Sequence, residues 1–149
     1  MIFPTQLTHY GLETKVNLVD QCPHITNSSH ELYGCVTLNR NEALLQCKGI
    51  ADFRVSMGTD VQIKYYIKHL SCNDYLHSFV TGLLLLQKEH LLLHGNSFIY
   101  DNQVIALCGD SHTGKSCLTA QFYRAGAWFF SDELVCFSEG NQLLPGYPF

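Results

Sequence analysis

The 149-residue chain contains 46% hydrophobic and 15% charged residues and carries a formal net charge of −4. This composition is typical of one globular domain, or of a small domain joined to part of a second. The negative balance offers no basic surface for nucleic acid or an anionic membrane, so neither is an expected partner.

The seven cysteines lie at least nine residues apart, so no C-x-x-C pair is present to begin a zinc or redox site. The odd number of cysteines, and the lack of an N-terminal stretch with the cationic and apolar regions of a signal peptide, favour a reducing cytoplasm. The apolar run 79–93 is interrupted by Gln87–His90 and falls short of the ~20 residues that a membrane-spanning helix needs. We therefore expect a soluble, cytoplasmic protein.

The first half of the chain has the two-residue period of β-strands. Residues 52–57 and 60–67 alternate apolar and polar side chains, and Gly58–Thr59 separates them. This arrangement predicts an antiparallel hairpin with a type II′ turn. Two further strands are expected over 10–18 and 32–38, so residues 1–70 form a β-rich N-terminal region.

The period changes after residue 70. Apolar side chains recur every three or four residues from Tyr75 to Leu84, which predicts a helix that begins near Ser71. Leu85 and Leu86 extend the apolar surface, so we expect this helix to be covered on more than one side.

Another hairpin is expected after that helix. Residues 94–100 and 103–108 flank Asp101–Asn102, a candidate tight turn. The apolar run 104–108 is typical of a strand whose sheet is covered on both faces.

The stretch GDSHTGKS, residues 109–116, satisfies the pattern G-x-x-x-x-G-K-[ST]. Its glycines allow backbone amides to turn toward phosphate oxygens, Lys115 can reach the β- and γ-phosphates, and the Ser116 hydroxyl can bind Mg²⁺. A buried strand precedes it, and a helix over 115–125 closed by Gly126 follows. The alternative is a glycine-rich turn between strand and helix. The expected phosphate-binding residues are Gly109, Asp110, Ser111, His112, Thr113, Gly114, Lys115, Ser116 and Cys117.

An acidic pair follows the next expected strand, residues 127–131. Asp132 and Glu133 would then lie at the carboxyl end of that strand, on the side of the sheet where ligands bind in α/β folds. One carboxylate can hold Mg²⁺ and the other can accept a proton from an attacking hydroxyl. The alternative is a solvated acidic turn. On pattern alone, His94 is more typical of a core residue.

Several of these runs together resemble a known family. The stretches LLLHGNSFIYDNQVIALCGDSHTGKSCL, WFFSDELVCF and LLPGYP are similar to the nucleotide-binding domain of HPr kinase/phosphorylase and of related serine kinases from bacterial peptide-modification clusters. The resemblance covers residues 73–149, and YGLETKVNL and CKGIADFRVSMGTDVQIKYY look like the β-rich leader of the kinase-like relatives. It implies an α/β (α+β) fold, in which the β-rich region 1–70 precedes a P-loop, phosphoenolpyruvate-carboxykinase-like domain over 71–149. Because the family pattern continues past PGYP, it also implies that this domain is incomplete at its C-terminus.

The resemblance assigns roles to individual residues. It implies that Asp132 activates the hydroxyl of a substrate serine and that His94 partners this carboxylate. Ser116 would bind Mg²⁺, and Glu133, which stands where the family usually has an aspartate, would be a second metal ligand. Cys117 also departs from the family pattern and would contribute its backbone amide.

The resemblance therefore implies an ATP- and Mg²⁺-dependent serine kinase that acts on a peptide or small protein, with Asp132, His94 and Lys115 as catalytic residues. Two other functions suit the same residues: a nucleotide- or phosphate-binding module without catalysis, and an NTPase or a phosphorylase that runs the transfer backwards. An open apolar sheet edge in this region would also suit a homo-oligomer.

Overall fold

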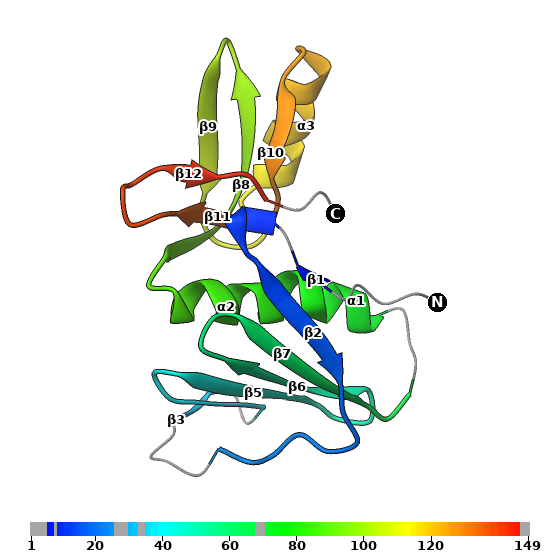
Figure 1. Ribbon diagram of the computed structural model, residues 1–149. Coiled ribbons are helices and arrows are strands. Elements are labelled where there is room, and N and C mark those ends of the chain that lie inside the picture. The colour runs from blue at the N-terminus through cyan, green and yellow to red at the C-terminus, as the bar shows by residue number, and fades with distance from the viewer. Residues whose placement is uncertain (1–5, 8, 26–29, 33–34, 68–70, 147–149) are drawn as a thin grey trace. The chain divides into compact units, whose positions relative to one another are not determined.

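The computed structural model describes residues 6–7, 9–25, 30–32, 35–67 and 71–146 (Figure 1). The chain forms two compact units, one comprising Met1–Thr8 and Leu12–Glu89 and the other His9–Gly11 and His90–Phe149. Each unit contains one β-sheet, and helices are few. The protein is therefore a mixed α+β protein, which confirms the expected class at this level.

A seven-stranded sheet forms the first unit, in the order β1-β2-β7-β6-β5-β4-β3. Strands β2 and β7 are parallel and the other neighbours are antiparallel. The strands are β1 (Gln6–Leu7), β2 (Thr14–Leu18), β3 (His30–Leu32), β4 (Val36–Leu38), β5 (Glu42–Cys47), β6 (Ala51–Ser56) and β7 (Asp60–Tyr65).

The hairpin expected near residue 58 is confirmed as β6 and β7. Its turn closes with a hydrogen bond of 3.1 Å from Thr59 N–H to the Ser56 carbonyl. Both central residues, Met57 and Gly58, have positive φ, at 55° and 65°. The turn is therefore type I′ rather than the expected type II′, because type II′ has positive φ at the first central residue alone.

Two expectations for this half of the chain were wrong in detail, and one strand was missed. The strand expected over 32–38 is divided between β3 and β4, and residues 33–34 of that range lie outside the described residues. The strand expected from Tyr10 begins at Thr14, after a short 3₁₀ turn η1 (His9–Gly11). Strand β5 was not expected, because its central residues are buried consecutively and show no alternation.

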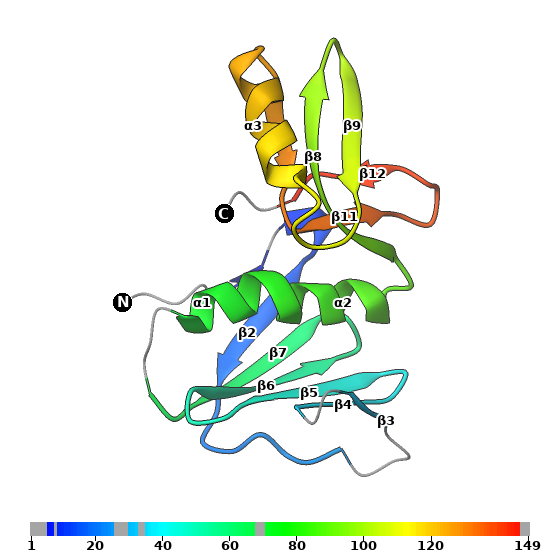
Figure 2. The ribbon, with the colours of Figure 1, turned by 180° about the vertical axis from the view of Figure 1, so that it is seen from behind.

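The expected helix begins at Ser71 and runs through three segments, α1 (Ser71–Tyr75), the π-helical η2 (Leu76–Val80) and α2 (Thr81–Gln87). Figure 2 shows α1 and α2 lying in line across the sheet of the first unit. Leu85 is fully buried, as its expected place off the main apolar stripe requires, but Phe79 and Leu86 remain 61% and 56% exposed, so the expected cover on more than one side is incomplete.

This helix packs on the first sheet through one stripe. The π-helical turn adds one residue to the helical repeat. The buried members of the helix are Cys72, Leu76, Val80, Thr81, Gly82, Leu84 and Leu85. At its end, the Gln87 side chain accepts a hydrogen bond of 2.8 Å from the Gly58 N–H in the β6–β7 turn. The compact units consequently divide after the helix, at Glu89, whereas the boundary expected from the change of period precedes it.

The second unit is built around the long strand β8 (Leu91–Tyr100). Strand β9 (Gln103–Cys108) pairs along one side of β8, and β10 (Trp128–Ser131) and β11 (Leu134–Phe137) pair in succession along the other. Strand β12 (Leu143–Leu144) pairs with β11. All strand pairings described in this sheet are antiparallel. Helix α3 (Lys115–Arg124) packs on the sheet through Phe122, whose ring centroid lies 4.4 Å from that of Phe98 in β8.

Local signals predicted this unit well. Asp101 and Asn102 form the expected tight turn with φ of 51° and 58°, a type I′ geometry. Helix α3 ends as expected at Gly126, whose φ is 95°, and the Ala127 N–H donates a hydrogen bond of 2.9 Å to the Phe122 carbonyl. This pattern, together with the bond from Gly126 N–H to the Tyr123 carbonyl, is the Schellman motif.

The expectation that residues 104–108 are covered on both faces was wrong. Among the described strands β9 pairs with β8 alone, so it lies at the edge of the sheet. Val104 is 39% exposed and Cys108 is also exposed. An apolar run of this length has the same appearance in an edge strand and a central strand, because sequence does not specify the neighbours.

Candidate functional site

Gly95 in β8 is the residue around which the candidate site is assembled. On one side it pairs with Cys108, the last residue of β9. On the other side its N–H donates a hydrogen bond of 3.1 Å to the Glu133 carbonyl. Because neighbouring strands lie ~4.8 Å apart, the end of β9 and the backbone at Glu133 are separated by roughly 10 Å.

Only glycine fits at this position. A Cβ atom on Gly95 would lie 2.4 Å from the Leu107 carbonyl oxygen, well inside normal contact. Both β9 and β10 are antiparallel to β8, so they run parallel to each other and their carboxyl ends lie at the same end of the sheet. The segments after both strands, which contain the loop 109–116 and Asp132, consequently begin on the two sides of β8 at that end.

We call residues 109–116 the glycine loop. Its backbone has positive φ at Gly109 (155°), His112 (66°) and Gly114 (90°), a sequence of conformations that turns the chain sharply into α3. The Thr113 hydroxyl donates a hydrogen bond of 2.8 Å to the Asp110 carbonyl and closes the loop internally. Apart from half-buried Lys115, every residue of the loop is exposed.

The Lys115 side chain folds back over the start of the glycine loop. Its Nζ donates hydrogen bonds of 2.8 Å to the carbonyls of Gly109 and Asp110. Just beyond, the backbone N–H groups of Lys115, Ser116 and Cys117 have no acceptor among the described residues. These free donors at the start of α3, with the positive end of the helix dipole, make this position favourable for an anion.

The acidic pair occupies an irregular turn between β10 and β11. The register of β10 against β8 shifts before Ser131, and Glu133 adopts a φ of 60°. The turn is held by hydrogen bonds to Asp132: its carboxylate accepts from the Glu133 N–H at 3.0 Å, and its carbonyl accepts from Leu134 N–H at 2.7 Å. Asp132 is half-buried and Glu133 is exposed, so the two carboxylates have different surroundings.

Asp132 also acts electrostatically on α3. Burial, and in addition the negative charge of Asp132, raises the pKa of the Tyr123 hydroxyl.

His94 is exposed and lies beside the acidic turn. Its Nδ1 donates a hydrogen bond of 3.2 Å to the Glu133 carbonyl, which leaves Nε2 as the nitrogen without a proton in the neutral ring. The resemblance implies a histidine that partners the Asp132 carboxylate. In the structure the described contact of His94 is with the neighbouring carbonyl, so His94 and the Gly95 N–H hold the same oxygen.

Among the described residues, no three His, Cys, Asp or Glu side chains lie close enough together to hold a metal ion. Mg²⁺ at nucleotide sites is bound by one or two protein oxygens together with phosphates and water, so it does not need such a cluster. The metal-binding roles of Ser116 and Glu133 therefore stay predictions.

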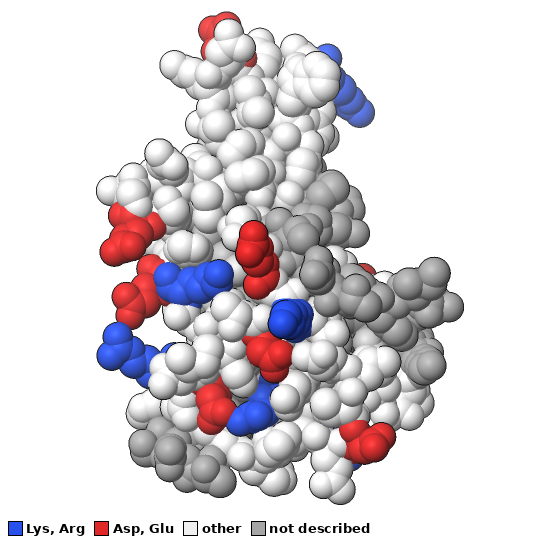
Figure 3. Space-filling view, viewed as in Figure 1, with Lys and Arg blue, Asp and Glu red and all other residues white. Residues whose placement is uncertain are grey.

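An open pocket of about 450 Å³ adjoins the glycine loop and is lined by Ala106, Leu107, Cys108, Thr113, Gly114, Lys115 and Leu118. Residues 90–149 contain one lysine and one arginine, Lys115 and Arg124. In the view of Figure 3 the charged side chains gather over the first unit, and the visible face of the second unit is largely uncharged. Lys115 is the only lysine or arginine of the glycine loop.

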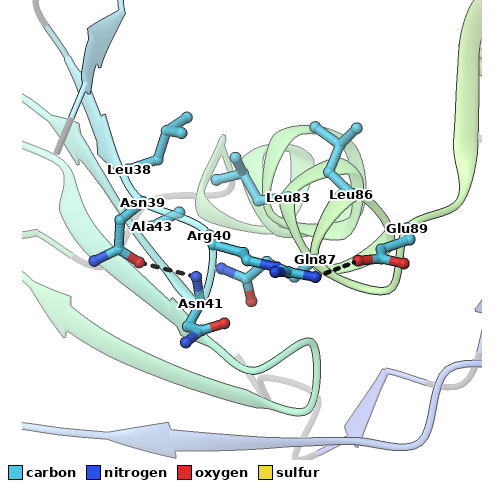
Figure 4. A pocket seen from close by; sticks show the side chains of 9 residues that line it. All are labelled: Leu38, Asn39, Arg40, Asn41, Ala43, Leu83, Leu86, Gln87 and Glu89. Atoms are coloured by element: carbon cyan, nitrogen blue, oxygen red, sulfur yellow. Dashed lines mark hydrogen bonds and ion pairs between the residues drawn. The ribbon is translucent and has the colours of Figure 1, made fainter.

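A separate pocket of about 310 Å³ lies in the first unit, between the β4–β5 turn and α2 (Figure 4). Leu38, Leu83 and Leu86 line it, and an ion pair of 3.0 Å between Arg40 and Glu89 lies beside it. Both charged side chains are more than three-quarters exposed, so the pair contributes little stability. None of the residues that line this pocket is one that the sequence indicated as a candidate catalytic, phosphate-binding or metal-binding residue.

The sequence did not single out two buried polar residues behind the glycine loop. The Asn96 side chain in β8 donates a hydrogen bond of 3.3 Å to the Thr119 hydroxyl in α3. Thr119 lies four residues after Lys115, which is one helical turn, and this spacing is the signal that could have identified it. Nothing in the sequence near Asn96 points to its partner.

Comparison with protein families, with curated proteins and with solved structures gives no match for this chain. None of the described helices is both long enough and apolar enough to span a lipid bilayer.

Proposed function

We propose that the glycine loop binds the phosphates of a nucleoside triphosphate and that the protein is an HPr-kinase-like serine kinase. The observation that carries this proposal is the position of Gly95, which pairs with the strand leading to the loop and bonds to the turn that contains Asp132. A phosphate-binding loop and a carboxylate at the same end of a sheet are the two parts that phosphoryl transfer to a hydroxyl requires. In this proposal residues 90–149 of the second unit contribute a P-loop domain of the phosphoenolpyruvate-carboxykinase-like kind.

Lys115 binds the β- and γ-phosphates in the proposed complex. It exchanges the carbonyls of Gly109 and Asp110 for phosphate oxygens, while the free N–H groups of Ser116 and Cys117 bind further oxygens. Bound Mg²⁺ would neutralise charge on the transferring phosphoryl group, with the Ser116 hydroxyl and the Glu133 carboxylate as its protein ligands.

Asp132 accepts the proton of the acceptor serine. Half burial and the hydrogen bond from the Glu133 N–H hold the carboxylate in one orientation, which favours a positioned base. His94 supports this arrangement indirectly, since it bonds to the Glu133 carbonyl that follows Asp132. The acceptor is a serine of a peptide or small protein.

A phosphate-binding module without catalysis is the second candidate. It is favoured by the hydrogen bond of His94 to a carbonyl oxygen, because Asp132 then lacks the histidine partner that the resemblance implies. Such a module needs the glycine loop but not Asp132.

Binding is tested by calorimetric titration of the full chain with ATP and Mg²⁺. Replacing Lys115 with alanine removes a charged hydrogen-bond donor, so affinity should fall about 10- to 150-fold. Lys48→Ala is the matched control, because Lys48 is an exposed lysine of the β5–β6 turn in the first unit. Equal affinity of Lys115→Ala and wild type would show that the loop does not bind the triphosphate.

Catalysis is tested by transfer of label from the γ-phosphate to serine-containing peptides. Asp132→Asn should lower transfer about 10²- to 10⁴-fold and leave ATP binding intact, with the exposed Glu139→Gln as control. Binding without transfer in wild type would favour the phosphate-binding module. Release of free phosphate without an acceptor would identify an NTPase instead.

A further inference from the structure

Thr119 is the only buried residue of α3, with 5% of its surface exposed. Its hydroxyl donates a hydrogen bond of 2.9 Å to the Lys115 carbonyl, one turn earlier in the helix. The same hydroxyl accepts the bond of 3.3 Å from the Asn96 side chain. Thr119 therefore connects the backbone of Lys115 to strand β8.

Asn96 is 7% exposed and follows Gly95 directly in β8. These two residues contact three segments of the candidate site. Gly95 pairs with the end of β9 and bonds to the Glu133 carbonyl, and Asn96 bonds to α3 through Thr119. The loop is thereby attached to β8 at both of its ends.

The burial of Asn96 and Thr119 between β8 and α3 calls for an explanation. Burying an amide and a hydroxyl costs free energy unless both are hydrogen-bonded. Phe98 and Phe122 show that the rest of the interface between α3 and β8 is aromatic and apolar. The polar pair lies instead at the N-terminal part of α3, where the backbone of Lys115 must hold a defined position.

We infer that Asn96 and Thr119 are positioning residues that fix Lys115 and the first turn of α3 relative to Asp132. They touch neither phosphate nor acceptor in this scheme and act through the Lys115 backbone. The inference deepens the proposed function and rests on it, since it concerns the geometry of the same phosphate site.

The test uses the full chain and compares Thr119→Val with Thr119→Ser. Valine keeps the shape of threonine without the hydroxyl, whereas serine keeps the hydroxyl. Binding of inorganic tripolyphosphate with Mg²⁺ is followed by NMR chemical shifts, which measure dissociation constants into the millimolar range. We expect Thr119→Val to weaken binding about three- to tenfold, the effect of one hydrogen bond, and Thr119→Ser to stay within about twofold of wild type.

A second comparison separates positioning from general loosening of the fold. In a Lys115→Met background, Thr119→Val should weaken binding less than it does in wild type, because the Lys115 Nζ that it positions through the backbone is gone and only the N–H groups of the first turn remain. An equal loss in both backgrounds would overturn the inference, as would a Thr119→Val protein that binds as tightly as wild type. If Thr119→Val does not fold, Asn96→Ala is compared in the same two backgrounds with the same criteria.

Different results would contradict the proposed function and the positioning role of Asn96 and Thr119. If wild type does not bind tripolyphosphate, or binds it independently of Lys115, the proposed function is wrong and this inference falls with it. If wild type binds in a Lys115-dependent way and the Thr119 variants behave alike, the proposed function stands and the positioning role is wrong.

Discussion

Substitution of Gly95 by alanine tests the framework on which the candidate site depends. The added Cβ would lie 2.4 Å from the Leu107 carbonyl oxygen and 3.0 Å from the Cys108 sulfur. Carbon and oxygen atoms normally approach to about 3.3–3.6 Å, so β9 must move away from β8 by roughly 1 Å. The obstructing oxygen belongs to the backbone and cannot rotate away.

The expected cost follows from this displacement. Overpacking typically costs about 1–3 kcal/mol, and a weakened ladder hydrogen bond adds about 1 kcal/mol, which together make about 2–4 kcal/mol. Gly140→Ala is the control, because a Cβ there meets no atom within 4 Å and the backbone φ is not positive. Its stability should change by less than about 0.5 kcal/mol.

Urea unfolding measures the difference. Trp128 is the only tryptophan of the chain and lies in β10, so its fluorescence reports on the second unit. With a slope of about 1–3 kcal/mol per molar urea, Gly95→Ala should unfold at a midpoint at least about 0.5 M lower than Gly140→Ala. Equal midpoints would refute the pairing of Gly95 with Cys108, and with it the proximity of the glycine loop to Asp132.

Three further predictions concern the second unit, and the same urea assay checks each of them. Gly126→Ala should cost about 1–2 kcal/mol, because a residue with a side chain must adopt a φ of 95° although the space for the Cβ is free; an unchanged midpoint would contradict the Schellman geometry. Phe98→Ala should cost about 3–5 kcal/mol, since the ring is fully buried against Phe122, and a loss below about 1 kcal/mol would mean that α3 is not packed there. Burial raises the pKa of Cys136 from 9.0 to about 11, so above pH 9 the unfolded thiol ionises before the folded one. The stability that Cys136 contributes is therefore complete below pH 9 and is lost as the pH rises to about 11, and Cys136→Ala should flatten this dependence.

The local elements of the second unit could be predicted because their causes lie within a few residues. Asp101–Asn102 tolerates the positive φ of a type I′ turn, and Gly126 supplies the left-handed residue that ends α3. The glycine loop was located from its motif for the same reason. Its two glycines adopt conformations that other residues rarely reach.

Predictions of burial, which depend on the segments packed against a strand or helix, were less successful. Residues 104–108 have the composition of a central strand, yet β9 is an edge strand among the described residues. The helix from Ser71 was expected to be covered on more than one side, but Phe79 and Leu86 remain exposed. Both errors have one origin, since burial depends on segments that are distant in the chain.

The sequence by itself determined several of the turns, most of the stretches that form strands and helices, and which residues are chemically equipped to bind phosphate. These properties follow from side-chain type and backbone preference over short distances. Only the tertiary structure decided that Gly95 lies between the glycine loop and the acidic turn, that His94 bonds to the Glu133 carbonyl, and that Asn96 reaches Thr119. Each of these contacts joins residues from different elements, and the pairing of β8 on both of its sides, which no local pattern encodes, is what brings them together.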